Sequence, residues 1–357
     1  ESAVRETSML VEVADAVAGD FRPLIRATGV VRPARDILLR PRIGGEVVEL
    51  SAAFVPGGFV DRGGQLLRID DADYRIVLEQ RKSELQQAIA LLEIEQGRQD
   101  IAERDYRQLG KTLEDDNRAL VLREPQLRSA EAAVQSARAA LEKAQLDLDR
   151  TRISSPFDAQ VLSREVNLGS QVSDGDTLAR LVGDDQYWVE TTVPLDRLRW
   201  LSFPDEGGLS GSVVTVRHNT AWPAGQTRNG RLYRLVGELE GDTRMARVLV
   251  TVDDPLSLQE TSAGLPQLLI GSFVQCIVEG RLIRDVVKID RKHVRKNDTA
   301  WVMKDGRLEV RQLDIVFMDA EHAYTRKGLD NGDQVVTTSL SRVREGAALR
   351  LKPVGGD

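Results

Sequence analysis

The acidic side chains of Asp70, Asp71 and Asp73 stand close enough in the sequence to bind a calcium ion together. The segment lacks the glycine and the final glutamate with which an EF-hand loop closes around calcium. The residues that follow have helical periodicity, and carboxylates are stabilising at the positive end of a helix dipole. We therefore interpret this cluster as the N-cap of a helix rather than as a calcium site.

Soft metal ligands are few and widely separated. A copper or zinc site needs several such side chains close together, and no HxH or HxxxH spacing occurs. A site assembled by folding stays open, but the sequence itself predicts no metal and no cofactor. The single cysteine, Cys276, lies in an alternating apolar run, which predicts a buried strand residue rather than a reactive thiol. The histidines and methionines are His218, His293, His322, Met9, Met245, Met303 and Met318.

Sequence patterns for other chemistry are also missing. The pairs Gly57-Gly58 and Gly63-Gly64 are not followed by the Gly-Lys-Ser/Thr of a phosphate loop. Three histidines give little scope for a Ser-His-Asp arrangement, and 4% aromatic residues are too few for a deep aromatic-lined substrate pocket. A net charge of −7 without a long basic run argues against nucleic-acid binding. We expect a protein that is not an enzyme.

The elements that carry these residues fall into three stretches. A chain of 357 residues predicts two to four domains. Residues 1–71 and 184–357 contain short apolar runs separated by glycine, proline and aspartate, which is typical of β structure. Residues 72–151 have helical periodicity instead. The sequence predicts a mostly β, elongated multidomain protein with one long helical insertion.

The helical stretch has the heptad pattern of a coiled coil. In both arms the seam positions alternate at spacings of four and three, which places them on one face of each helix, and the segment 111–117 between the arms is polar. We predict an antiparallel hairpin of two helices of about 35–40 residues each, roughly 50–60 Å long. The expected seam residues are Tyr74, Leu78, Arg81, Leu85, Ala88, Leu92, Glu95, Gln99, Ala102, Tyr106, Leu109 and Leu113 in the first arm, and Leu120, Arg123, Leu127, Ala130, Val134, Ala137, Leu141, Ala144 and Leu148 in the second.

The segments on either side of the hairpin form an internal repeat. Residues 57–69 and 169–181 each have the pattern strand, turn, strand, with glycine where a positive φ is expected. Neither half has enough apolar residues to fold alone, so we expect the two halves to close into one β-sandwich from which the hairpin emerges. The identical pairs are Gly57/Gly169, Val60/Val172, Gly63/Gly175, Leu66/Leu178 and Arg68/Arg180.

This split repeat resembles the two halves of a lipoyl or biotinyl domain, and with the hairpin between them it resembles the membrane fusion protein family, the HlyD-like periplasmic adaptors. Residues 151–158 resemble the start of the second lipoyl half in that family, and residues 328–336 a segment of its membrane-proximal domain. Residues 268–274 resemble a strand of its β-barrel, although Ile270 and Ser272 replace the usual proline and methionine. The hairpin length is similar to that of the branch that serves resistance-nodulation-division (RND) pumps.

The resemblance implies four modules, through which the chain runs out and back. A lipoyl carrier needs a lysine at the turn between its halves, and here the hairpin replaces that turn. The expected modules are a membrane-proximal β domain (1–31 and 286–357), a β-barrel (32–40 and 184–285), a lipoyl-like domain (41–71 and 152–183) and the α-helical coiled-coil hairpin (72–151).

The resemblance also implies a function. Such an adaptor lies in the periplasm and links an inner-membrane RND transporter to an outer-membrane channel for efflux, assembling into a trimer or hexamer. We expect it to be anchored to the inner membrane by an N-terminal segment absent from this chain. The alternatives are an adaptor of an ABC exporter or secretion system, or a periplasmic binding protein, which would need a concave polar site. The sequence does not indicate the transported substrate.

The hairpin turn carries the candidate partner-binding residues. RND adaptors have an Arg-x3-Leu-x6-Ser pattern there, which grips the channel. An ungapped match places its positions at Asp105, Leu109 and Asp116, so the leucine is kept and aspartate stands at the other two. Arg104 lies next to the first position, and Leu113 is the next seam residue. We expect these five residues to contact the channel, with Asp116 able to cap the second helix; the alternative for Leu109 is that it only closes the seam.

Overall fold

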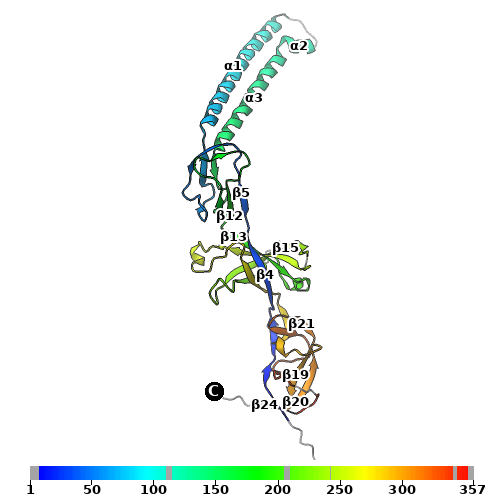
Figure 1. Ribbon diagram of the computed structural model, residues 1–357. Helices are drawn as coiled ribbons and strands as arrows, with labels where there is room; N and C mark the ends of the chain where they lie inside the picture. The colour runs from blue at the N-terminus through cyan, green and yellow to red at the C-terminus, as the bar shows by residue number, and fades with distance from the viewer. Residues whose placement is uncertain (1–7, 110–114, 205–209, 242, 341–343, 353–357) are drawn as a thin grey trace, which may run out of the picture. The chain divides into compact units, whose positions relative to one another are not determined.

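The computed structural model describes residues 8–109, 115–204, 210–241, 243–340 and 344–352. The chain divides into two units, Arg35–Asp184 and the combination of Glu1–Ala34 with Asp185–Asp357, and each has its own hydrophobic core (Figure 1). Strands dominate both units apart from one long helical hairpin, which confirms the expected fold class. Within the described ranges no helix is both long and apolar enough to cross a membrane.

The unit Arg35–Asp184 is a sandwich of two four-stranded sheets with the hairpin inserted between its halves. Each sheet contains strands from both sides of the hairpin, so neither half of the repeat can form its sheets alone. The first sheet has the order β5 (Asp36–Leu39), β12 (Ala179–Gly183), β10 (Ala159–Arg164), β7 (Phe59–Val60), and the second β11 (Gln171–Val172), β6 (Gly45–Leu50), β8 (Gln65–Ile69), β9 (Arg152–Ser154).

The repeat has the expected backbone. The glycines of its two halves have positive φ at equivalent positions, 84° at Gly57 and 79° at Gly169, then 78° at Gly63 and 91° at Gly175. A side chain at these positions would strain the turns, which explains why glycine occurs there in both halves. The other shared residues Leu66 and Leu178 are fully buried in the sandwich core.

The hairpin contains α1 (Ala72–Leu109), α2 (Asp115–Val121) and α3 (Glu124–Asp149). The acidic cluster caps α1 as expected, because the carboxylate of Asp70 accepts from the amide of Ala72 at 3.1 Å. Asp71 is buried and pairs with Arg75 at 2.7 Å. Among the described residues, no group of three or more histidine, cysteine, aspartate or glutamate side chains is arranged to hold a metal ion.

The second unit contains a closed six-stranded barrel. Its strands, in order around the barrel, are β13 (Gln186–Val193), β16 (Ala246–Asp253), β15 (Arg228–Leu239), β14 (Val213–Arg217), β17 (Phe273–Glu279) and β4 (Leu24–Pro33). Alternate residues fill the interior, among them Cys276, which is fully buried. Burial raises the pKa of the Cys276 thiol to about 12, so this cysteine is the buried strand residue that the alternating run predicts.

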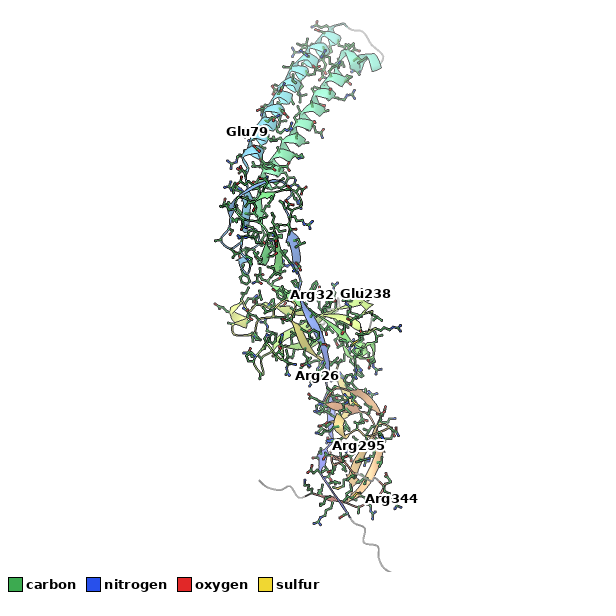
Figure 2. The ribbon with its side chains drawn as sticks, in the orientation of Figure 1. Arg26, Arg32, Glu79, Glu238, Arg295 and Arg344 are labelled. Atoms are coloured by element: carbon green, nitrogen blue, oxygen red, sulfur yellow. The ribbon has the colours of Figure 1, made fainter. Side chains whose placement is uncertain are left out.

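The rest of this unit contains β1 (Met9–Val11) in parallel with β24 (Leu349–Leu351), and two four-stranded sheets. In this part of the unit the guanidinium of Arg295, which is labelled in Figure 2, lies 4.2 Å from the centroid of the Trp301 ring. The sheets have the orders β21 (Ile315–Met318), β22 (His322–Thr325), β18 (Ile283–Asp290), β3 (Val17–Phe21) and β2 (Val13–Asp15), β23 (Gln334–Val336), β19 (Thr299–Lys304), β20 (Arg307–Gln312). Short 3-10 helices are η1 (Leu195–Trp200), η2 (Glu260–Ser262) and η3 (Arg291–His293).

Two of the expected module boundaries are wrong by one strand. The sequence predicts that 32–40 belongs to the barrel, but β5 pairs with β12 and belongs to the sandwich. The barrel instead takes its N-terminal strand from β4, most of which lies in the predicted membrane-proximal module 1–31. The cause is that β4 alternates without interruption from Leu24 to Pro33, so the division between the units falls directly after this strand, between Ala34 and Arg35.

Removal of the hairpin should leave the β structure folded. Strands β8 and β9, which flank the hairpin, are paired directly, with Arg68 opposite Arg152, so a short turn can join them. We expect a variant that lacks residues 75–149 to remain soluble and to unfold cooperatively, with a small shift in melting temperature by calorimetry. Loss of any cooperative transition would show that the sandwich needs the hairpin.

Candidate partner-binding site

The two long helices pack along the predicted seam. α1 and α3 run antiparallel in Figure 1. Every expected seam residue of α1 from Tyr74 to Tyr106, and of α3 from Leu127 to Leu148, is buried or half-buried. Burial along one face of each helix is the pattern of a coiled coil, here made with few large apolar side chains. The coiled-coil prediction is therefore confirmed for most of the hairpin.

Two expected seam positions are occupied by charged residues that pair with each other. The guanidinium of Arg123 donates to both carboxylate oxygens of Glu95, with Nε–Oε1 and Nη2–Oε2 distances of 2.6 and 3.1 Å. Glu95 is buried in the seam. The Arg123 guanidinium is the main cause that lowers the pKa of this carboxyl, which stays charged at neutral pH.

The second arm is not one continuous helix, contrary to prediction. It breaks at Leu122 and Arg123, between α2 and α3, and Pro125 stands in the first turn of α3. The break takes α2 out of the seam. Leu120, expected as a seam residue, is instead 60% exposed, and its neighbour Val121 is exposed as well.

The structure places the five predicted contact residues as follows. Arg104 and Asp105 are exposed near the end of α1, and Leu109 is its last residue. Asp116 is the second residue of α2, inside its first turn and not at the N-cap position expected for it. Leu113 lies outside the described residues. The end of α1 and the start of α2 thus carry the four described candidates.

Exposed apolar side chains along the second half of α1 were not predicted. Leu91, Ile94 and Ile101 on α1 are 56%, 52% and 58% exposed. Each of the three directly precedes a seam residue, and Ile94 and Ile101 are seven positions apart, so this spacing in the sequence is the signal that could have identified an exposed apolar face.

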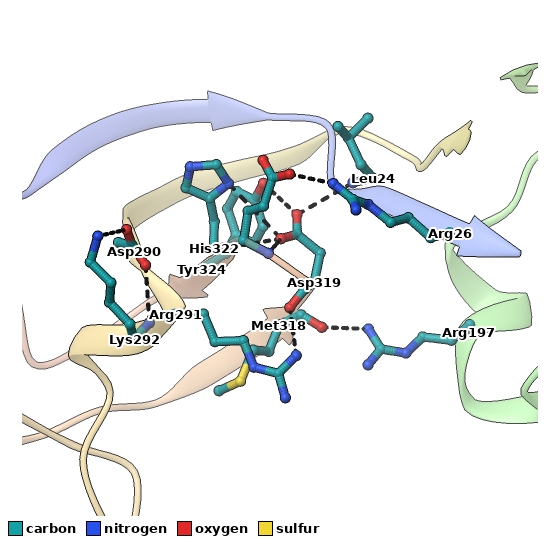
Figure 3. A network of polar contacts seen from close by, with 11 residues as sticks. Leu24, Arg26, Arg197, Asp290, Arg291, Lys292, Met318, Asp319, His322 and Tyr324 are labelled. Atoms are coloured by element: carbon teal, nitrogen blue, oxygen red, sulfur yellow. Dashed lines mark hydrogen bonds and ion pairs between the residues drawn. The ribbon is translucent and has the colours of Figure 1, made fainter. Parts of the chain in front are cut away.

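A second region of dense polar contacts lies within the other unit, where the turn between β21 and β22 meets the barrel (Figure 3). Arg197 of η1 donates to the carbonyl of Met318 at 2.7 Å and lies over the ring of Phe317. Arg291 donates to the carbonyl of Asp319 at 3.1 Å, and Arg26 of β4 pairs with Glu321. One four-residue turn, Met318 to Glu321, therefore receives contacts from three separate elements.

Asp319 is the centre of this turn. Its carboxylate is almost fully buried and accepts from the amides of Glu321 and His322 at 2.8 and 2.7 Å. It also accepts from the hydroxyl of Tyr324 at 3.0 Å and from the amide of Leu24 in β4 at 3.4 Å. Burial, with the charge of Asp319 as a further cause, raises the pKa of Tyr324. The arrangement is that of a structural anchor, since the carboxylate oxygens are occupied by protein donors.

A lipoyl-like sandwich interrupted by a helical hairpin, in one chain with a six-stranded barrel, defines the adaptor architecture of membrane fusion proteins. Residues 35–183 match the family model for the barrel-sandwich hybrid domain of RND membrane fusion proteins. This match covers the sandwich and the whole hairpin. This match and the relatives described below support a membrane fusion protein of RND-type efflux pumps, a periplasmic adaptor in tripartite efflux.

Sequence relatives and solved structures extend the similarity beyond that domain. The multidrug resistance protein MdtA of Shigella boydii and that of Escherichia coli K12 are each 24% identical over an alignment of 353 residues, with 96% of this chain and 79% of the relative covered. The crystal structure of MacA from Actinobacillus actinomycetemcomitans has a TM-score of 0.59 at 16% identity, with 91% of this chain and 99% of that chain covered. A MacA–MexA chimera with the α-hairpin domain of Pseudomonas aeruginosa MexA has a TM-score of 0.57 at 19% identity, with 91% and 100% covered.

Proposed function

We propose that this adaptor contacts an outer-membrane channel through the distal end of its hairpin and an RND transporter through the unit that contains the barrel. Proteins of its family act with both kinds of partner. The observation that carries the proposal is the position of the hairpin, inserted at the turn of the sandwich where a carrier domain would present its lysine. A long helical insertion at that turn is suited to reach a partner.

Self-association is a further part of the proposal. We infer that several copies, as a trimer or hexamer, surround the transport path, and that an N-terminal segment outside this chain anchors each copy to the inner membrane. The outward faces of α3 support lateral contact, because they carry the small exposed residues Ala132, Ala133 and Ala139. Small side chains permit close approach but bury little area, so assembly depends on the partners.

Copurification tests the proposal. The full-length protein, isolated from native membranes in mild detergent, should bring down one inner-membrane transporter of the RND type and one outer-membrane channel in the same complex. Recovery with an ABC transporter instead would show that the adaptor serves another exporter. A deletion strain tested against a panel of drugs and metals would then identify the substrate class, for which the relatives' name supports drugs.

The charge at Asp105 should influence which channel is accepted. This side chain is exposed near the end of α1, where the family pattern has arginine, so a channel with complementary basic groups is expected. Asp105→Arg should weaken docking to the cognate channel about tenfold, which corresponds to about 1.4 kcal/mol. Binding of the purified variant to channel-containing nanodiscs measures this, and an unchanged affinity would remove Asp105 from the contact surface.

A further inference from the structure

Arg123 is the residue at which the second arm of the hairpin breaks. Its backbone φ of 58° lies in the left-handed region, where a residue with a side chain is strained and glycine is not. Its amide donates to the carbonyl of Leu120 at 3.2 Å, and the amide of Leu122 donates to that of Arg118 at 2.9 Å, as at an ordinary helix end. Glycine is usual at such a position, so an arginine there needs a reason beyond the turn.

The side chain of Arg123 supplies that reason, because it crosses the seam to α1. Its guanidinium binds Glu95 through two parallel hydrogen bonds, the geometry in which arginine and carboxylate recognise each other most specifically. Arg98, one turn further along α1, faces the same carboxylate at 3.5 Å. The residue that adopts the unusual backbone conformation is therefore also the residue that is tied to the opposite helix.

A partly buried ion pair is a poor way to stabilise a coiled coil but a good way to specify its geometry. Apolar residues at two facing seam positions often stabilise the folded state as well as the charged pair does. Apolar side chains tolerate sliding and rotation, whereas two parallel hydrogen bonds hold one arrangement. We therefore expect the Glu95–Arg123 pair to fix the direction of the chain segments on either side of Arg123, which are α2 and α3.

We propose that the Glu95–Arg123 pair fixes the direction in which α2 departs from the hairpin and thereby sets Asp116 relative to Arg104 and Asp105. Both members of the pair are positioning residues and do not themselves contact the channel. The consequence for docking rests on the proposed function, whereas the effect on α2 is a property of this chain alone.

Distance measurements on the full chain test the effect on α2. Spin labels at Asp100→Cys and Arg118→Cys report the separation of α1 and α2 by pulsed electron resonance, and Cys276 is too deeply buried to label. We expect a narrow distribution in the parent protein. In Glu95→Leu/Arg123→Leu the distribution should become about twofold wider while helicity and melting temperature are kept, since the apolar pair still packs. The matched control is Glu79→Leu/Lys82→Leu, which removes an exposed pair within α1.

Arg123→Gly tests the effect of the left-handed turn separately from the effect of the Glu95–Arg123 ion pair. Glycine adopts the left-handed conformation without strain, so this variant keeps the turn and loses only the link to Glu95. We expect its distribution to be as wide as that of the double leucine variant. Exchange of the charges in Glu95→Arg/Arg123→Glu should restore a narrower distribution. Narrow distributions in both Arg123→Gly and the double leucine variant would overturn the proposal, because the turn alone would then set the direction of α2.

Cross-linking in cells tests the consequence for docking. With a photo-reactive amino acid at Asp105, the yield of adducts in the outer-membrane fraction should fall about tenfold in the double leucine variant and stay constant in the Glu79/Lys82 control. A widened distribution with an unchanged yield would overturn the positioning role in docking. Absence of adducts from the parent protein would contradict the proposed function, and the distance measurements would still decide whether the pair directs α2.

Discussion

Leu109→Asp is expected to abolish efflux while the purified protein keeps its helicity and melting temperature. Leu109 is the last residue of α1 and matches the leucine of the family's hairpin-end pattern. A leucine that enters an apolar pocket of a channel contributes about 2–4 kcal/mol to binding, and a carboxylate there adds a desolvation penalty. Drug or metal tolerance of a complemented deletion strain, with circular dichroism of the same variant, measures both quantities.

Gln108→Asp is the matched control for this substitution. It introduces the same charge one residue earlier, at an exposed position outside the pattern, and should leave efflux intact. If Leu109 only closes the seam, Leu109→Asp should lower the melting temperature, and efflux should fall only in proportion to the folded fraction. Intact efflux in Leu109→Asp cells would show that the hairpin end does not dock through this residue.

Asp319→Ala is expected to destabilise the barrel-containing unit by about 3 kcal/mol, because it leaves the partly buried amides of Glu321 and His322 and the buried hydroxyl of Tyr324 without an acceptor. The loss of these bonds also frees the amide of Leu24 in β4, so hydrogen exchange at that amide should accelerate. Urea unfolding of the full chain, with exchange measured by mass spectrometry, gives both results.

Two further variants check the cause. Asp319→Asn keeps one acceptor oxygen and should lose less stability than the alanine variant. Asp196→Ala removes a carboxylate that is 72% exposed and should change stability by less than about 0.5 kcal/mol. If Asp319→Ala unfolded at the same urea concentration as Asp196→Ala, the turn Met318 to Glu321 would not be an anchor between the sheets and the barrel.

The parts of the fold that were predictable are those whose residue types repeat at a regular spacing within a short segment. The heptad seam, the strands that contain Val248 and Phe273, and the turn glycines of the repeat all leave a pattern within a few residues. The break at Arg123 leaves a weaker pattern in the sequence, because nothing marks an arginine that adopts the left-handed conformation. Pro125 was the available signal, since proline is favoured in the first turn of a helix and unfavourable further inside.

Contacts between distant segments were beyond prediction. The amide of Leu24 and the carboxylate of Asp319 are 295 positions apart, and nothing in either segment indicates the other. The same holds for Glu95 and Arg123, although two opposite charges at facing seam positions were a usable signal once the hairpin was assumed. The candidate docking residues were inferred from the family's pattern at the hairpin turn and not from a heptad or strand periodicity, so they remain predictions.

The central claim is that one chain contacts a protein of each membrane. Photo-cross-linking in living cells tests it most directly, with the reactive amino acid placed either at Asp105 near the end of α1 or at the exposed Leu10 of β1. Mass spectrometry of the adducts should identify an outer-membrane channel from Asp105 only and an inner-membrane RND transporter from Leu10 only. The same partner at both positions, or soluble periplasmic proteins alone, would contradict the account.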